Sequence, residues 1–463
     1  MDVFFEYNSL WDLFLAPIYL FVIFFIAFRI ANSREYNESF YTYFTTGLLI
    51  KIAGGLFFTA IYTFYYHGGD CHAYFQGGRS LNNMILKAPS VYFSVLGGNT
   101  SDENWSYFDG STGYPPQTLF SKGGANFATA RYISPILMLS FNSMIVGTLL
   151  LDCFSYACIW KFFKILCNIY PGMSKKLALG ILFVPSLAFW GSGIMKDTFT
   201  YSATLLLTAS AYTIFFLRKK ILINLFFMLL SVILIVTLKP YILIALIPGL
   251  GLSIAYYYSK LLPNKLVGAV VAPLFVAIGL LIGGWSLAML GSQLGTYSTT
   301  EGIIEKAQIS QKDLLRTDQY GSNSFNIGEF DPSIGGMLKK APIAITAGVF
   351  RPFIWDARNP VMIISGIENS LLLFLLLFLM FKLGFKRFLN FIKEDPIVMF
   401  AFIFVLIFGF SVGISTANFG ALVRYKIPGT VFYTTGLMIL WGRYSEFIKK
   451  DAGISSSTSE GRK

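Results

Sequence analysis

The chain has 463 residues, of which 55% are apolar and only 13% charged, and its formal net charge is +12. Ordinary globular domains carry about 25% charged residues, so this composition excludes a water-soluble protein and predicts an integral membrane protein. The positive charges lie in short runs beside apolar segments, where anionic lipid and membrane topology explain them. Nucleic-acid binding is therefore not expected.

About eleven stretches approach the ~20 apolar residues that are needed to cross a bilayer. Backbone groups cannot bond water inside the bilayer, so these stretches are predicted to be helices packed in one bundle. The expected fold is all-α, a polytopic transmembrane bundle, with one domain over 1–450 and a disordered cytoplasmic tail at 451–463. We place the spans near 13–31, 44–66, 142–160, 177–194, 198–217, 221–238, 240–258, 266–288, 362–382, 396–414 and 427–442.

The distribution of Lys and Arg predicts the orientation, because cytoplasmic connections are enriched in both residues. It puts the N-terminus outside and the C-terminus in the cytoplasm, in a multi-pass protein of the bacterial cytoplasmic (inner) membrane. Two long regions, at about 67–132 and 289–361, are then extracytoplasmic and are expected to carry short surface helices. Loops of this length are usually functional. In the second region a surface helix is predicted from the spacing of Ile334, Met337, Leu338, Ala341, Ile345 and Val349.

Both histidines of the chain fall in the segment His67-Gly68-Gly69-Asp70-Cys71-His72, where an apolar stretch ends. Asp70, at a helix exit, is a candidate general base, although Gly-Gly-Asp is also good turn chemistry. A metal site formed by His67, Asp70 and His72 is a second possibility, but their spacing matches no compact ligand pattern. No metal or other cofactor is therefore assigned.

Three other predicted outer turns each contain a cation, although short outer connections usually carry few Lys and Arg residues. These are Lys196, followed by Asp197, then Lys239 and Arg424. Lys and Arg pair well with phosphate oxygens and can stabilise a departing phosphate. A Lys or Arg at a helix end can also extend its charged group toward water. This alternative explains any one of the three cations nearly as well as phosphate binding does, but it explains all three together less well.

Two charged residues lie within predicted spans. Lys51 is near an inner end and is expected to extend toward the membrane surface, whereas Asp152 is expected to make a structural hydrogen bond rather than a proton relay.

Taken in chain order, these motifs resemble the GT-C glycosyltransferase superfamily, and most closely its protein-mannosyltransferase-like branch, which uses polyprenyl-phosphate sugars. The segment Gly69–Tyr74, running on to Arg79, is similar to the acidic first-loop motif of the family. Lys196-Asp197 is similar to its second outer turn, and Lys239-Pro240 to its Lys-Gly-Pro-type turn. Arg424-Tyr425 through Pro428 is similar to the late Arg-Tyr-x-x-Pro motif.

The sequence also departs from the family pattern. Cys71 stands where the family usually carries a second acid, which argues against a metal. An extra predicted helix precedes the first loop, and no large C-terminal soluble domain follows the last span.

The resemblance implies an enzyme that moves a sugar from a polyprenyl-phosphate donor to a lipid, glycan or protein acceptor at the outer face of the membrane. Asp70 would be the catalytic base, and Lys196, Lys239 and Arg424 would hold the departing phosphate. The expected partners are the lipid-linked sugar and membrane lipid. The full set of expected site residues is Asp70 and Asp197 as catalytic residues and His67, His72, Tyr74, Arg79, Lys196, Lys239, Arg424 and Tyr425 as substrate-binding residues.

Three other functions remain open from the sequence. A polysaccharide polymerase or ligase that uses undecaprenyl-pyrophosphate glycans would share the helices, the outer loops and the outer arginines, among them Arg79 and Arg131. A lipid or solute transporter would place ionisable groups near mid-membrane. A non-catalytic scaffold is compatible with Cys71. The glycosyltransferase mechanism requires Asp70, Lys196, Lys239 and Arg424 to surround a single cavity.

Overall fold

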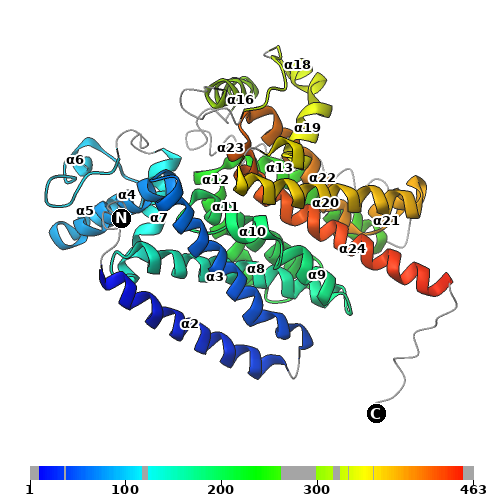
Figure 1. The fold of residues 1–463 in the computed structure, drawn as a ribbon, viewed down its shortest axis with the longest axis horizontal. Helices are drawn as coiled ribbons and strands as arrows, with labels where there is room; N and C mark the ends of the chain where they lie inside the picture. The colour runs from blue at the N-terminus through cyan, green and yellow to red at the C-terminus, as the bar shows by residue number, and fades with distance from the viewer. Residues whose placement is uncertain are drawn as a thin grey trace.

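The computed structural model describes residues 10–35, 38–116, 124–261, 299–315, 324–331, 333–357 and 359–451. Within these ranges every element is a helix, apart from one isolated β-bridge between Ser324 and Asn418. Among the described residues, seven helices are long and apolar enough to cross a membrane, so the structure confirms a membrane-embedded helical protein (Figure 1). Their bounds are Leu10–Glu35 (α2), Ser39–Tyr65 (η1, α3 and η2), Met144–Ile169 (α8), Ile221–Leu238 (α12), Pro240–Lys260 (most of α13), Pro360–Leu383 (α20) and Pro396–Ser415 (α22).

Two further long helices, α11 (Lys196–Phe215) and α24 (Ile427–Asp451), occupy predicted spans but are more polar. α11 is rich in Thr and Ser, yet it is buried through most of its length. Its hydroxyls donate to carbonyls one turn earlier, for example Thr204 to Thr200 and Thr208 to Thr204. These internal hydrogen bonds satisfy the hydroxyl groups, which lets a polar sequence form a central helix.

The predicted span at 177–194 is wrong as a single helix. The structure has two short helices there, α9 (Ser174–Ile181) and α10 (Pro185–Trp190). Pro185 lacks a backbone N–H and begins the second of them, as proline does at the first position of a helix. The predicted span at 266–288 and the tail at 452–463 lie outside the described residues.

The first predicted outer region is more helical than expected. It contains the 18-residue helix α4 (Asp70–Lys87), α5 (Pro89–Leu96), α6 (Asp102–Trp105) and the start of α7 (Ala125–Leu139). α4 and α7 pack side by side, with the Asn82 amide donating to Asn142 just beyond α7 (Figure 1). This packed pair forms one wall of the site described below.

The second predicted outer region contains α16 (Thr300–Leu314), α18 (Ile334–Lys339) and α19 (Ala341–Phe350). The single surface helix predicted at 334–349 is therefore two helices, which meet at Lys340 just before Pro342. α19 packs against α22, whereas Ile334 and Leu338 of α18 are exposed. The predicted helical spacing is correct, but the break between the two helices was not predicted.

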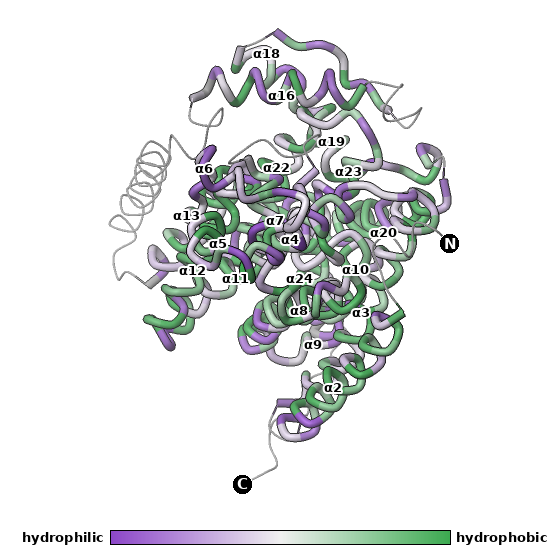
Figure 2. Tube along the Cα trace, turned by 90° about the vertical axis from the view of Figure 1, so that its left-hand side faces the viewer, coloured by the Kyte–Doolittle hydropathy of each residue, from purple (hydrophilic) through white to green (hydrophobic). Residues whose placement is uncertain are grey.

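The apolar surface of the molecule lies on its long helices. α2 and α12 carry a mainly hydrophobic sequence along their length in Figure 2. Large side chains such as Phe21 of α2 and Leu222 of α12 are exposed, at 72% and 84%. A helix that leaves such groups outside the protein is suited to contact lipid tails.

A buried ion pair connects two of the spans to the turn before α11. Asp152 of α8 accepts a hydrogen bond from the Gly193 N–H at 3.2 Å, and Lys51 of α3 donates to the Gly191 carbonyl. The Lys51 Nζ and Asp152 Oδ1 atoms are 3.9 Å apart. The expectation that Lys51 reaches the membrane surface is wrong, because its side chain is only 3% exposed and turns inward to this pair. The hydrogen bond expected for Asp152 is confirmed.

Replacing one member of this pair will strongly destabilise the protein. Asp152→Leu leaves the Lys51 ammonium buried without a counter-charge, and losses of about 3–5 kcal/mol are typical of such changes. Thermal unfolding in detergent will measure the loss. The double variant Lys51→Met/Asp152→Leu removes both charges and is expected to recover much of it. A loss in the double variant equal to the sum of the losses in Lys51→Met and Asp152→Leu would show that the two charges are independent.

Candidate functional site

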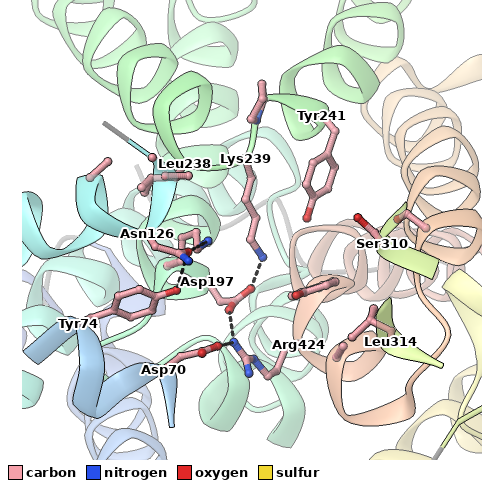
Figure 3. A pocket seen from close by; sticks show the side chains of 18 of the residues that line it. Asp70, Tyr74, Asn126, Asp197, Leu238, Lys239, Tyr241, Ser310, Leu314 and Arg424 are labelled. Atoms are coloured by element: carbon pink, nitrogen blue, oxygen red, sulfur yellow. Dashed lines mark hydrogen bonds and ion pairs between the residues drawn. The ribbon is translucent and has the colours of Figure 1, made fainter. Parts of the chain in front are cut away.

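A single cavity of about 1960 Å³ lies where α4, α7, α11 and α23 (Phe419–Tyr425) meet the junction of α12 and α13, with α16 and α22 forming another side (Figure 3). Both predicted outer regions contribute to its wall, through α4 and α7 from the first and α16 from the second. The predicted site residues that line it are His67, Asp70, Tyr74, Lys196, Asp197, Lys239, Arg424 and Tyr425. The structure thus brings together residues from four distant parts of the chain.

Asp70 enters the cavity because a sharp turn precedes α4. His67, Gly68 and Gly69 have φ values of 53°, 138° and 123°. Such values suit glycine and cost a non-glycine residue about 1–2 kcal/mol. Asp70 therefore does not end the preceding helix, as expected from the sequence, but begins a new one. The positive end of the α4 dipole favours its carboxylate.

Asp197 lies between two cations. The Lys239 ammonium contacts its Oδ1 at 2.5 Å, and the Arg424 Nη2 atom lies 3.5 Å from its Oδ2. The side chain is only 2% exposed. Burial alone raises the pKa of Asp197, but Lys239 and Arg424 lower it overall, so the carboxylate stays charged.

Arg424 joins the two carboxylates. Its Nη2 atom donates to Asp70 Oδ2 at 2.8 Å, and Nη1 donates to the Tyr62 hydroxyl at 3.3 Å. Asp70 is the more accessible acid, with 37% of its side chain exposed to the cavity. The guanidinium is thus held in place by groups on three elements and still faces the open space (Figure 3).

Lys196 is held on the other side of the cluster. It donates to the Asn126 side-chain carbonyl at 2.6 Å, and Tyr74 donates to the same oxygen at 3.2 Å. Burial lowers the pKa of Lys196 to about 8, and repulsion from Lys239 contributes to the same shift. The Lys239 ammonium also lies 4.4 Å from the centre of the Tyr425 ring, a favourable cation–π distance.

Segments of the second predicted outer region and α20 hold the helix that carries Arg424. The Asn418 side chain caps α23 by accepting from the Gly420 and Ala421 N–H groups at 2.8 and 3.2 Å. The Phe325 N–H donates to the Ala417 carbonyl at 2.8 Å, just before that cap. Lys426, just after Arg424, donates to the Asn369 side-chain carbonyl at 2.7 Å. Both ends of α23 are therefore tied to neighbouring segments.

Two predicted site residues do not line the cavity. His72 is buried between Thr63 and Cys71, with its ring nitrogens 3.3 Å from the Thr63 Oγ1 and 3.2 Å from the Cys71 Sγ. Burial lowers the pKa of His72 to about 4, so it is neutral at pH 7. Arg79, further along α4, is exposed. In the part of the chain that the structure describes, no three His, Cys, Asp or Glu residues converge in a group that could hold a metal ion.

Sequence reasoning missed two polar residues of the site. Asn126 gave no signal, because a neutral amide in a long loop looks like ordinary turn chemistry. Tyr62 was placed inside an apolar span, but it lies in a π-helical turn, Ile61–Tyr65, that rotates its hydroxyl toward Arg424. Such turns often occur at functional sites and are not visible in hydropathy.

The cluster carries three cations, Lys196, Lys239 and Arg424, and two carboxylates, Asp70 and Asp197. One positive charge is therefore in excess at the wall of the cavity. Such an arrangement can bind an anion with two or more acceptor oxygens, while Asp70 accepts a proton from a neighbouring hydroxyl.

Comparison with known proteins identifies no family, because no protein-family model, curated protein or solved structure matches the chain.

Proposed function

We propose that this protein is a glycosyltransferase that moves a sugar from a polyprenyl-phosphate donor to an acceptor hydroxyl, at the outer face of a bacterial cytoplasmic membrane. One observation carries the proposal: Asp70 and the cations Lys196, Lys239 and Arg424 line one cavity in a membrane-embedded helical protein. The resemblance of the same residues to motifs of GT-C enzymes supports the reaction type.

The chemistry is a displacement at the anomeric carbon of the donor sugar. The acceptor oxygen forms the new bond to this carbon and gives its proton to Asp70. The bond from the anomeric carbon to the phosphate oxygen breaks, and its electron pair leaves with the polyprenyl phosphate. The three cations stabilise the charge that develops on that phosphate, which is commonly a large part of catalysis.

The contact between Arg424 and Asp70 gives the donor a further role. A phosphate at Arg424 competes with Asp70 for the same N–H groups. Donor binding would thus free the Asp70 carboxylate oxygen to accept a hydrogen bond from the acceptor hydroxyl.

A transporter is less well supported. The two ionisable groups within the predicted spans, Lys51 and Asp152, form an ion pair and contact the Gly191–Gly193 turn, and neither lines this cavity. Their arrangement is that of a structural pair.

Asp70→Asn is expected to lower the rate of sugar transfer by about 10²–10⁴-fold, the usual contribution of a general base. Donor binding should be unchanged or tighter, because a carboxylate that competes for Arg424 is removed. The measurement is release of undecaprenyl phosphate from undecaprenyl-phosphate-linked mannose, glucose and galactose by the full-length protein in nanodiscs. Asp109→Asn is the matched control, since Asp109 pairs with Lys87 and does not line the cavity. Transfer by Asp70→Asn at the wild-type rate would show that another group takes the proton.

The pH dependence of kcat/KM is expected to follow the titration of the Lys196 ammonium group. The ammonium form binds phosphate and predominates below its pKa of about 8, so kcat/KM for the donor should fall as the pH rises through 8. Lys196→Arg keeps its charge at higher pH and should move this fall upward. An unchanged profile in Lys196→Arg would assign the titration to a different group.

A further inference from the structure

Arg131 is a cation of the cavity that the mechanism above does not use. It lies on α7 and lines the cavity together with Gly97 and Gly98 of the turn after α5. Its Nε atom is buried and donates no hydrogen bond to any described residue. No ion pair joins Arg131 to a carboxylate in the described part of the chain. A buried donor without a partner is unfavourable, so the unpaired guanidinium of Arg131 favours a ligand that accepts from it.

A glycine turn lies directly beside the Arg131 guanidinium. Gly98 has a φ of 109°, and a Cβ atom there would lie 3.3 Å from the Arg131 Nη1 and 3.4 Å from the Nη2. Any other residue would be strained and would press on the guanidinium. Glycine therefore lets this turn approach Arg131 without displacing it from the cavity wall.

Arg131 lies further along α7 than the residue that holds Lys196. Asn126, which accepts from Lys196, lies five residues before it, and at 1.5 Å per residue this separates the two backbone positions by about 7.5 Å along the helix axis. Ala125 and Ala128 also line the cavity on this helix. Arg131 therefore offers the cavity a cation that is held apart from the pair formed by Lys196 and Asn126.

We propose that Arg131, with the turn at Gly97 and Gly98, forms a second oxyanion subsite that binds a phosphate or carboxylate carried by one of the two substrates. The proposal rests on the proposed function, because it assigns a second charged group to the same substrates. If that group is on the donor, the donor is a lipid pyrophosphate. If it is on the acceptor, the acceptor is an acidic glycan.

The test compares binding to the full-length protein in nanodiscs with and without this guanidinium. The probes are undecaprenyl phosphate, undecaprenyl pyrophosphate, and two oligosaccharides that differ only in ending with glucose or glucuronate. Arg131→Gln is expected to leave undecaprenyl phosphate and the glucose-ended oligosaccharide unaffected. It should weaken either the pyrophosphate or the glucuronate-ended probe by about tenfold or more, as for loss of a charged hydrogen bond. The probe that is affected identifies the source of the second oxyanion.

Arg131→Lys retains the charge without the fork-like geometry and should bind the affected probe with intermediate strength. Arg29→Gln, an exposed arginine on α2 outside the cavity lining, controls for the loss of one positive charge. Equal binding of every probe to Arg131→Gln and wild type overturns the subsite, and so does an equal loss for all four. If wild type binds no lipid phosphate but its preference for the glucuronate end is lost in Arg131→Gln, the subsite stands and the polyprenyl-phosphate donor is wrong.

Discussion

The carboxylate of Asp197 is the group on which the cation cluster depends. Burying an ammonium or a guanidinium costs several kcal/mol per ion unless a partner compensates it. Asp197 compensates Lys239 and Arg424 together, from the first turn of α11. These contacts indicate that Asp197 positions the two cations. The catalytic role expected for it stays a prediction.

The buried pair of Lys51 and Asp152 supports the cation cluster around Asp197. It holds the Gly191–Gly193 turn, and this turn leads directly to Lys196 and Asp197. Two ion pairs in series thus connect the apolar spans to the cavity. This explains how a membrane protein with few charges can keep five of them close together: each is fixed by an opposite charge or by a hydrogen bond to a packed helix.

The sequence predicts the site residues that are charged and lie at the ends of apolar helices. Each of the three cations, Lys196, Lys239 and Arg424, interrupts the apolar pattern at a turn that is too short to place it anywhere but near one membrane surface.

Hydropathy likewise predicted the long helices, because contact with lipid imposes a length and a composition on a helix. It did not predict the break before Pro185, which begins a second short helix in place of one continuous span. The roles of Asn126 and Tyr62 depend on contacts across 70 and 362 residues of sequence, to Lys196 and Arg424. No local pattern encodes such contacts. His72 was chosen for its residue type alone, and burial between Thr63 and Cys71 gives it a structural environment instead.

Lys196, Lys239 and Arg424 are proposed to bind the phosphate of a lipid-linked substrate. The most direct measurement is an experimental structure of the full-length protein in lipid nanodiscs with undecaprenyl phosphate bound. We predict phosphate density within hydrogen-bond distance of these three side chains, with the contact between Arg424 and Asp70 lengthened or broken. Phosphate bound elsewhere, with Arg424 still paired only to Asp70 and Asp197, would contradict it.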